Sequence, residues 1–229
     1  MFFLSDMLNR KLHLPKPEEA LRGRGRPLAT ARRHLVFRQP LKGPFPAESR
    51  QALFAMGNFW SAEPVFWSLP GVLMTAAGYS GGFTPNPTRQ EVCTGMTGHA
   101  ETVLVTFDPA RIGFESLLSA FFEHHDPTQG MKQGGDVGTF YRSAIFCFDD
   151  DQAKRSGQAR AACAGALSKA GLGAVTTAVA PAGPFYYAEA EHQQYAFRSP
   201  GTVRPATRTG IALPESPAER TASGGQDSA

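Results

Sequence analysis

The chain has 229 residues, enough for one well-filled hydrophobic core, and its 41 % hydrophobic and 19 % charged residues are typical of a globular protein. No apolar run approaches the roughly 20 residues of a membrane span, and three scattered cysteines are too few for a disulfide framework or a zinc knuckle. With a net charge of only +3 and no nucleic-acid-binding motif, we expect a cytoplasmic monomer with no nucleic-acid or membrane partner.

Residues 1–50 are rich in Pro, Arg and Gly and form a basic N-terminal extension. They hold eleven Lys and Arg against four Asp and Glu, a net charge of +7. Residues 6–14 fit a short helix that ends before Pro15, because proline disfavours helix in the residue that precedes it. The rest is predicted to be an extended arm that wraps around the domain or projects into solvent. A solvated extension is the simpler interpretation of the charge, and contact with an acidic surface is the alternative.

From residue 51 onward, short apolar runs alternate with amphipathic segments. In chain order we predict a strand over 53–56, a helix over 59–69, strands over 72–77 and 99–107, a helix over 114–124, a strand over 143–148, a helix over 149–170, a strand over 174–180 and a short helix at 191–195. The polar loop at 125–138 has a length that is usually functional in a compact domain.

The last segment, residues 201–229, contains few large apolar side chains and is predicted to be a flexible tail. The domain proper then spans residues 51–200. Its mixture of strands and helices predicts an α/β (α+β) two-layer sandwich, in which helices flank a mixed sheet.

The corner between the first predicted strand and the first predicted helix is the centre of the functional interpretation. Gly57 permits a tight turn there, and Asn58 is a favourable N-cap for the helix that follows. A side chain at such a corner points into a cleft and lies near the positive end of the helix dipole. A cysteine in this place would have a lowered pKa and be a strong nucleophile. This chain has Asn58 there instead, and that residue limits what can be concluded about catalysis from the sequence.

Seven separated motifs together resemble the peptide methionine sulfoxide reductase A family, over roughly residues 51–200. They are Gly57-x-Phe59-Trp60-x-Ala62-Glu63, Gly78-Tyr79-x-Gly81-Gly82, Thr84-Pro85-Asn86-Pro87-Thr88, Glu91-Val92-Cys93-x-Gly95-x-Thr97-Gly98-His99, His125-Asp126-Pro127-Thr128-Gln129-Gly130-Met131, Asp136-Val137-Gly138-Thr139-x-Tyr141-Arg142-Ser143 and His192-Gln193-Gln194-Tyr195. The resemblance implies a sheet with a ferredoxin-like core.

The resemblance also implies a reaction, that of a peptide-methionine (S)-S-oxide reductase acting on oxidised proteins and on free methionine sulfoxide. In that family a corner cysteine attacks the sulfoxide sulfur, the sulfoxide oxygen is protonated, and methionine leaves a sulfenic acid on the cysteine. Cysteines near the C-terminus resolve the sulfenic acid to a disulfide, which thioredoxin reduces. The resemblance implies no metal and no organic cofactor.

Two residues at the corner, and one in the strand predicted over 99–107, match the family's methyl pocket and its proton donor. Phe59 and Trp60 match the aromatic wall that holds the methionine methyl group, with ordinary core packing as the alternative. Glu101 matches the proton donor; burial in a cleft would raise its pKa, which suits a general acid. The alternative for Glu101 is an exposed carboxylate at a strand end.

Four later residues match the polar and aromatic remainder of the site. Asp136 and Tyr141 match residues that bind the sulfoxide oxygen or its water, and Asp136 is otherwise a turn-forming residue between glycines. Tyr187 and Tyr195 match tyrosines near the same site, with core packing and a bonded hydroxyl as the alternative. For the remaining matched polar residues we expect structural hydrogen bonding; they are Glu63, His99, His125 and His192.

The chain departs from the family pattern at the positions that carry the chemistry. Asn58 replaces the nucleophile, and an amide nitrogen is not basic and cannot displace oxygen from sulfur. Arg89 stands where the family usually has a tyrosine lining the site, and the C-terminal motif with its resolving cysteine is missing. Cys93 is a candidate substitute nucleophile, whereas the two other cysteines, Cys147 and Cys163, are expected to be buried and inert.

Three hypotheses follow. The first is a methionine sulfoxide reductase by descent whose activity is impaired. The second is a catalytically inactive homologue that binds methionine sulfoxide or methionine in peptides, with Arg89 recruiting an acidic neighbour of the methionine. The third is a decaying gene copy or a frameshift, which the loss of family pattern after Gly201 would fit. Turnover with thioredoxin or dithiothreitol separates the first hypothesis from the others.

Overall fold

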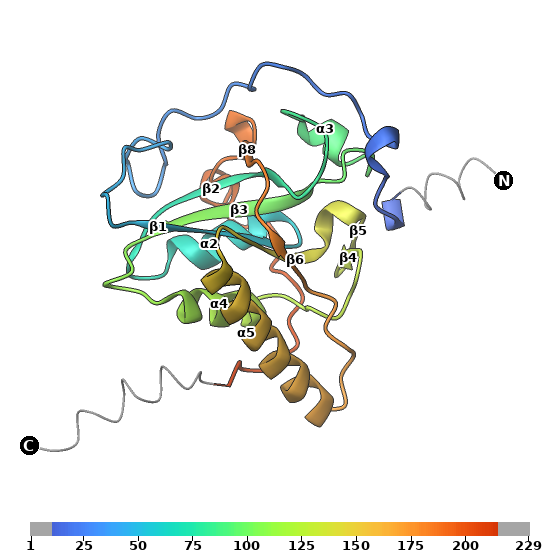
Figure 1. Ribbon diagram of the computed structural model, residues 1–229. Coiled ribbons are helices and arrows are strands. Elements are labelled where there is room, and N and C mark those ends of the chain that lie inside the picture. Colours follow the sequence, from blue (N-terminus) through green and yellow to red (C-terminus); the bar gives the residue numbers. More distant parts are fainter. Residues whose placement is uncertain (1–10, 215–229) are drawn as a thin grey trace, which may run out of the picture.

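The structure, a computed structural model, describes residues 11–214 and is built on a six-stranded mixed sheet with the strand order β7-β6-β1-β3-β2-β8 (Figure 1). All neighbouring strands pair antiparallel except β6 and β7, which pair parallel. The strands are β1 (Arg50–Met56), β2 (Val72–Ser80), β3 (Ala100–Phe107), β6 (Ser143–Cys147), β7 (Ala178–Pro181) and β8 (Tyr186–Tyr187).

Both faces of the sheet are buried, which explains why the strands read as apolar runs without strict alternation. On β1, Ala52, Phe54 and Met56 belong to one hydrophobic cluster, and Leu53 and Ala55 belong to a second cluster on the opposite face. This division follows the two-residue period of a strand. The sheet therefore needs a covering layer on each side.

Helices α2 (Phe59–Trp67), α4 (Phe114–Glu123) and α5 (Asp150–Lys169) cover the first face (Figure 1). Leu117 and Phe121 on α4 are fully buried in the same cluster as Phe54. Asp149 caps α5 by accepting a hydrogen bond from the backbone N–H of Gln152 at 2.7 Å. The predicted mixed sheet with flanking helices is confirmed. None of the helices in residues 11–214 combines the length and the hydrophobicity that a membrane crossing requires.

The N-terminal segment covers the second face, so the simpler interpretation of a solvated extension is wrong for this part of the chain. Leu41 is 1 % exposed and belongs to the second hydrophobic cluster. His34 is also buried, and its Nε2 lies 2.9 Å from the hydroxyl of Thr75 on β2. Figure 1 shows this segment, in blue, on the side of the sheet away from α4 and α5. The helix predicted over 6–14 lies mostly outside the described residues.

The start of the C-terminal segment packs on the domain, contrary to the prediction of a flexible tail. Ile211 and Leu213 pack against the helix-side cluster, and the backbone N–H of Leu213 donates to Glu123 at 2.9 Å. The rest of the predicted tail, residues 215–229, lies outside the described residues.

Several short elements complete the fold, and most of them were not expected from the sequence. A two-stranded sheet falls within the polar loop predicted at 125–138, and the short helix predicted at 191–195 is divided between a 3₁₀ turn and a helical turn. The short elements are η1 (Pro17–Glu19), α3 (Arg89–Val92), β4 (Lys132–Gln133), β5 (Asp136–Val137), η2 (Thr139–Tyr141), η3 (Ala190–His192) and α6 (Tyr195–Arg198).

Candidate functional site

The corner between β1 and α2 is held by a glycine and an N-cap, as the sequence predicts. Gly57 has a φ of +90°, and a Cβ at this position would lie 2.6 Å from Cγ of Gln133. The turn therefore requires glycine for its backbone conformation and for the close approach of Gln133. Asn58 caps α2 by accepting a hydrogen bond on Oδ1 from the backbone N–H of Trp60 at 2.8 Å.

Glu101, near the start of β3, lies against this helix start. Its Oε2 accepts a hydrogen bond from the backbone N–H of Phe59 at 3.0 Å, and the residue is only 1 % exposed. The carboxylate thus uses one of the free N–H groups at the N-terminus of α2, where negative charge is stabilised. The alternative of an exposed strand-end carboxylate is excluded.

Arg89, the first residue of α3, pairs with the other oxygen of the same carboxylate. Its Nη2 lies 3.2 Å from Oε1 of Glu101. Burial raises the pKa of Glu101 to about 7, while the charge of Arg89 and the N–H of Phe59 act in the opposite direction. At neutral pH Glu101 is therefore poised between its acid and carboxylate forms, which suits proton donation to a ligand.

The aromatic wall expected from Phe59 and Trp60 is assembled, and Tyr195 belongs to it. Tyr195 stacks on Trp60 with ring centroids 4.1 Å apart and an interplanar angle of 18°. His192 adds a second aromatic contact, with its ring centroid 5.6 Å from that of Trp60 and 6.0 Å from that of Phe59. These side chains come from the N-terminal and C-terminal parts of the domain, so only the fold brings them together.

Asp136 and Tyr141 both lie close enough to Glu101 to interact with its carboxyl group electrostatically. Asp136, on β5, is exposed, and its charge contributes to raising the pKa of Glu101. Tyr141, in η2, is buried; burial first, and then the charge of Glu101, raises the pKa of its hydroxyl. A tyrosine with a raised pKa stays protonated and can donate a hydrogen bond to a ligand oxygen.

Tyr187 is the one predicted site residue that the structure does not bring to this group. It pairs with Gly78 on β2, packs with the second hydrophobic cluster, and has the ammonium of Lys42 4.6 Å from its ring centroid. Its neighbour Tyr186 pairs with Tyr79 and packs with the helix-side cluster instead. Successive strand residues point to opposite faces, so Tyr187 faces the N-terminal segment.

Glu189 was missed by sequence reasoning, although it organises one side of the site. It accepts a hydrogen bond from the hydroxyl of Tyr79 at 2.8 Å and another from the backbone N–H of Arg89 at 2.9 Å. Nothing in the local sequence connects Glu189 to residues about 100 positions earlier. Its only signal in the sequence is that it is one of two carboxylates, with Glu191, that follow the aromatic run 185–187 and precede His192.

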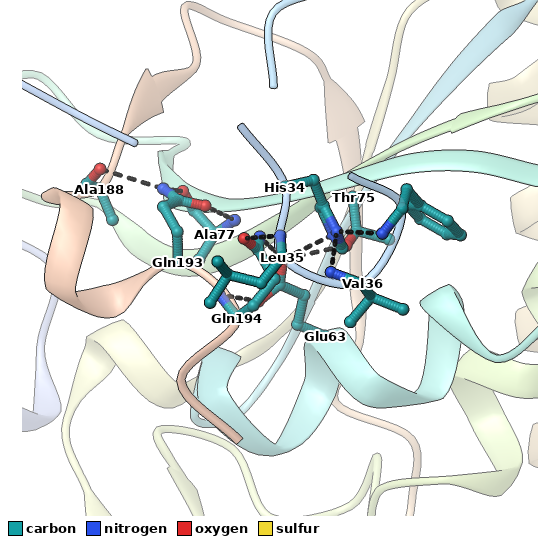
Figure 2. Close-up of polar contacts among 10 residues, drawn as sticks. His34, Leu35, Val36, Glu63, Thr75, Ala77, Ala188, Gln193 and Gln194 are labelled. Carbon is teal, nitrogen blue, oxygen red and sulfur yellow. Dashed lines mark hydrogen bonds and ion pairs between the residues drawn. The ribbon is translucent and has the colours of Figure 1, made fainter. Parts of the chain in front are cut away.

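A buried polar network supports the corner from behind, centred on Glu63 of α2 (Figure 2). Glu63 accepts hydrogen bonds from the hydroxyl of Thr75 at 2.9 Å and from the backbone and side-chain nitrogens of Gln194 at 2.9 and 2.7 Å. The side chain of the neighbouring Gln193 accepts a hydrogen bond from the backbone N–H of Ala77 and donates one to the carbonyl of Ala77. The predicted structural role of Glu63 is confirmed, because the network joins α2, β2 and the segment before Tyr195.

Structural hydrogen bonding, which the sequence predicts for three matched histidines, is found for His99 and His125, whereas the buried Nδ1 of His192 has no hydrogen-bond partner in the protein. His99 contacts the carbonyl of Thr84 through Nε2 at 2.7 Å, and His125 contacts the hydroxyl of Ser143 at the same distance. Within residues 11–214, no group of three or more His, Cys, Asp and Glu side chains is arranged to hold a metal ion.

Among the cysteines, only Cys93 lies at the site, at the end of α3. It is half-buried, and burial raises the pKa of its thiol, with the charge of Arg89 opposing and that of Glu101 reinforcing the shift. A thiol with a raised pKa is a poor nucleophile at neutral pH. Cys147 and Cys163 are buried, as expected.

Comparisons with known proteins agree with this arrangement. The family model for peptide methionine sulfoxide reductase matches residues 50–213. The chain is 52 % identical over 218 residues to the peptide methionine sulfoxide reductase MsrA of Ectopseudomonas mendocina, covering 95 % of this chain and all of that one. It is 51 % identical to MsrA 1 of Caulobacter vibrioides, covering 90 % of this chain and 95 % of that one.

Solved structures give the same result. The structure is similar to methionine sulfoxide reductase A of Corynebacterium diphtheriae, with a TM-score of 0.79, 40 % sequence identity, and coverage of 89 % of this chain and all of that one. It is also similar to reduced Mxr1 from Saccharomyces cerevisiae, with a TM-score of 0.64, 29 % identity, and coverage of 75 % of this chain and 95 % of that one. The chain therefore belongs to the peptide methionine sulfoxide reductase family.

Proposed function

We propose that this protein recognises methionine sulfoxide side chains in peptides and proteins at the Asn58 corner, and that it binds them without reducing them. The family reaction, reduction of methionine sulfoxide, defines the ligand class. The observation that carries the proposal is the intact wall of Phe59, Trp60 and Tyr195 beside the buried acid Glu101, at a corner that holds an amide in place of a thiol.

The proposed ligand matches these groups in chemistry. Its methyl group is apolar and suits the faces of Phe59 and Trp60, and its oxygen carries partial negative charge and needs hydrogen-bond donors. Glu101 supplies one donor when protonated, which its pKa of about 7 allows at neutral pH, and the hydroxyl of Tyr141 supplies another. Reduced methionine offers no such oxygen, so the site should prefer the oxidised form.

Asn58 removes the covalent step. In the family reaction a thiolate attacks the sulfoxide sulfur, methionine leaves, and the protonated sulfoxide oxygen ends on the cysteine as a sulfenic acid. This step requires a nucleophile with a lone pair of thiolate strength. The amide nitrogen of Asn58 has no such lone pair, and its Oδ1 already accepts the hydrogen bond that caps α2. Without a sulfenic acid there is no disulfide for thioredoxin to reduce, so a thioredoxin partner is not part of this proposal.

The second candidate function is a reductase in which Cys93 takes over as nucleophile. It is favoured by the position of Cys93 beside Arg89 and Glu101, and opposed by the raised pKa of its thiol. The monomeric state and the cytoplasmic location stay predictions.

The test is a paired assay on the natural protein and the Asn58→Cys variant, with a methionine-(S)-sulfoxide peptide and dithiothreitol, which bypasses the missing resolving cysteine. We expect the natural protein to bind the peptide saturably without turnover, and the variant to convert it to the methionine peptide. Asn58→Ser is the matched control, because serine also caps a helix but has no thiol; it should bind without turnover.

Two results would contradict the proposal. Turnover by the natural protein that is lost in Cys93→Ala would establish the second candidate function. Failure of the natural protein to bind, together with an inactive Asn58→Cys variant, would show that the pocket no longer accepts methionine sulfoxide.

A further inference from the structure

Both faces of the Trp60 ring are covered by the protein itself. Tyr195 stacks on it at 4.1 Å between centroids, and the guanidinium carbon of Arg89 lies 4.3 Å from the ring centroid. Two groups at these distances cannot share one face, so Arg89 and Tyr195 lie on opposite faces. The same guanidinium is 5.9 Å from the ring of Phe59. Arg89 therefore occupies the aromatic wall that the ligand methyl group would contact.

Arg89 also engages the carboxylate of Glu101, the proposed proton donor. The carboxylate of Glu101 has one oxygen bonded to the N–H of Phe59 and the other in the ion pair with Arg89. In this arrangement neither oxygen is free to donate a proton to a sulfoxide oxygen. One side chain, that of Arg89, therefore blocks both the aromatic wall and the carboxyl group of Glu101 from a ligand. This side chain is 21 % exposed.

The contacts of Arg89 are incomplete, which makes the side chain displaceable. Six buried side-chain polar atoms in residues 11–214 have no hydrogen-bond partner in the protein, and four of them belong to this cluster: Trp60 Nε1, Arg89 Nε, Glu101 Oε1 and His192 Nδ1. The Arg89–Glu101 contact is close enough for an ion pair but lacks hydrogen-bond geometry. Buried polar atoms without partners are uncommon in folded proteins and call for an explanation, such as a functional role.

We infer that Arg89 is an internal occupant of the ligand site, which a methionine sulfoxide side chain must displace from Trp60 and Glu101 in order to bind. This inference rests on the proposed function and adds the residue that regulates it. When Arg89 leaves, Glu101 loses its counter-ion inside a buried site and takes up a proton, and the protonated acid then donates to the sulfoxide oxygen. Binding is therefore coupled to proton uptake.

The coupling sets a pH dependence with a definite sign. Loss of Arg89 removes the charge that favours the ionised form of Glu101, so the pKa of Glu101 is higher in the complex than in the free protein. Affinity should fall as pH rises through and above 7, by up to about tenfold per pH unit. The charged and titratable groups that act on Glu101 or are acted on by it are Arg89 and Cys93 at α3, Tyr79 of β2, Asp136 of β5 and Tyr141 of η2.

The chain offers a matched control in Arg155 of α5. Arg155 also combines an ion pair, with Glu115, and a ring contact, with Phe114 at 5.2 Å, and it is 25 % exposed. It lies on α5 and has no contact with Trp60 or Glu101. Arg155→Leu therefore removes the same kind of interaction without opening the site.

The experiment measures the affinity of a fluorescently labelled methionine-(S)-sulfoxide peptide by polarisation, from pH 6 to 8, for the natural protein, Arg89→Leu, Arg89→Lys and Arg155→Leu. We expect Arg89→Leu to bind about tenfold more tightly at pH 7.5, since it removes a desolvated cation–π contact that competes with the ligand. Its affinity should also lose most of its pH dependence. Arg89→Lys, which keeps the charge without the planar stacking group, should fall between the two, and Arg155→Leu should match the natural protein.

A second readout follows Arg89 itself. The chain has two tryptophans, so in a Trp67→Phe background the fluorescence of Trp60 alone reports the loss of Arg89 from its face. Peptide binding should change this emission in the natural protein, and the Arg89→Leu variant should show much of that change before any peptide is added.

The outcomes separate the two proposals. If the natural protein binds and the Arg89 variants bind equally or more weakly, with an unchanged pH profile, Arg89 is not an occupant and the proposed function stands. If only Arg89→Leu binds, Arg89 occupies the site but the ligand does not displace it, so the displacement step and the proposed function of the natural protein both fail. If no variant binds, including Arg89→Lys, and thermal melts show all of them folded, the proposed function and this inference both fail.

Discussion

The imidazole of His34 and the hydroxyl of Thr75 are hydrogen-bonded at 2.9 Å across 41 residues of sequence. The same hydroxyl donates to Glu63, so it accepts from Nε2–H of His34. Nδ1 of His34 in turn accepts from the backbone N–H groups of Val36 and Phe37, both at 3.1 Å. This set of partners requires the neutral imidazole with its proton on Nε2. The N-terminal segment is thereby tied to the helix that carries the site.

Low pH should weaken the hydrogen bonds of His34 that join the N-terminal segment to Thr75. Burial lowers the pKa of His34 from 6.5 to about 4, so between these values the unfolded chain binds a proton at this residue that the folded chain does not. The contribution of His34 to stability is therefore present above pH 6.5 and lost as the pH falls towards 4. We expect the difference in unfolding free energy between the natural protein and His34→Gln to shrink over this window by on the order of 3 kcal/mol. Urea denaturation at several pH values measures it, and a difference that does not change with pH would contradict the argument.

The N-terminal segment should behave as part of the core. Leu41 is 1 % exposed on the sheet face opposite the helices. We expect Leu41→Ala to lower the unfolding free energy by about 2–4 kcal/mol. Leu14→Ala is the control, since Leu14 is 46 % exposed in the same segment and should change stability by about 0.5 kcal/mol or less. Equal small effects in both variants would restore the interpretation of a solvated extension.

The corner should tolerate only glycine at position 57. Gly57→Ala forces an alanine into a positive φ and places its Cβ against the side chain of Gln133, which should lower the unfolding free energy by about 1–3 kcal/mol. Gly157→Ala is the opposite case, because Gly157 lies within α5 with no atom near the added Cβ. That variant should raise stability by about 0.5–1 kcal/mol. Thermal or urea unfolding of the two variants checks the sign of each effect.

Two of the three tyrosines assigned to the site from the sequence, Tyr187 and Tyr195, should differ in their effect on ligand affinity. Tyr195→Ala removes the ring that stacks on Trp60, and we expect the affinity for a methionine sulfoxide peptide to fall by up to about tenfold. Tyr187→Ala acts on the opposite face of the sheet, against Lys42 and Phe185, and should leave the affinity unchanged. A loss of affinity in Tyr187→Ala with the fold intact would place this residue back in the site.

Local features were predictable because neighbouring residues decide them. The capping role of Asn58 depends on a hydrogen bond to the residue two positions later, and the apolar face of α4 depends on a repeat of three to four residues. Short elements such as α3 and β8 carry too little periodicity to be seen. β8 exists because two residues complete the edge of a sheet that the rest of the chain has already formed.

By itself, the sequence determined the family, the mixed sheet with its helices, the position of the corner, and the loss of the nucleophile at Asn58, because each depends on residue identity or local pattern. Only the tertiary structure decided that the basic segment is a covering layer, that Tyr187 faces away from the site, and that Arg89 lies between Trp60 and Glu101. These facts depend on contacts between residues that are distant in sequence, and such contacts are determined by the packing of the whole sheet with both of its layers.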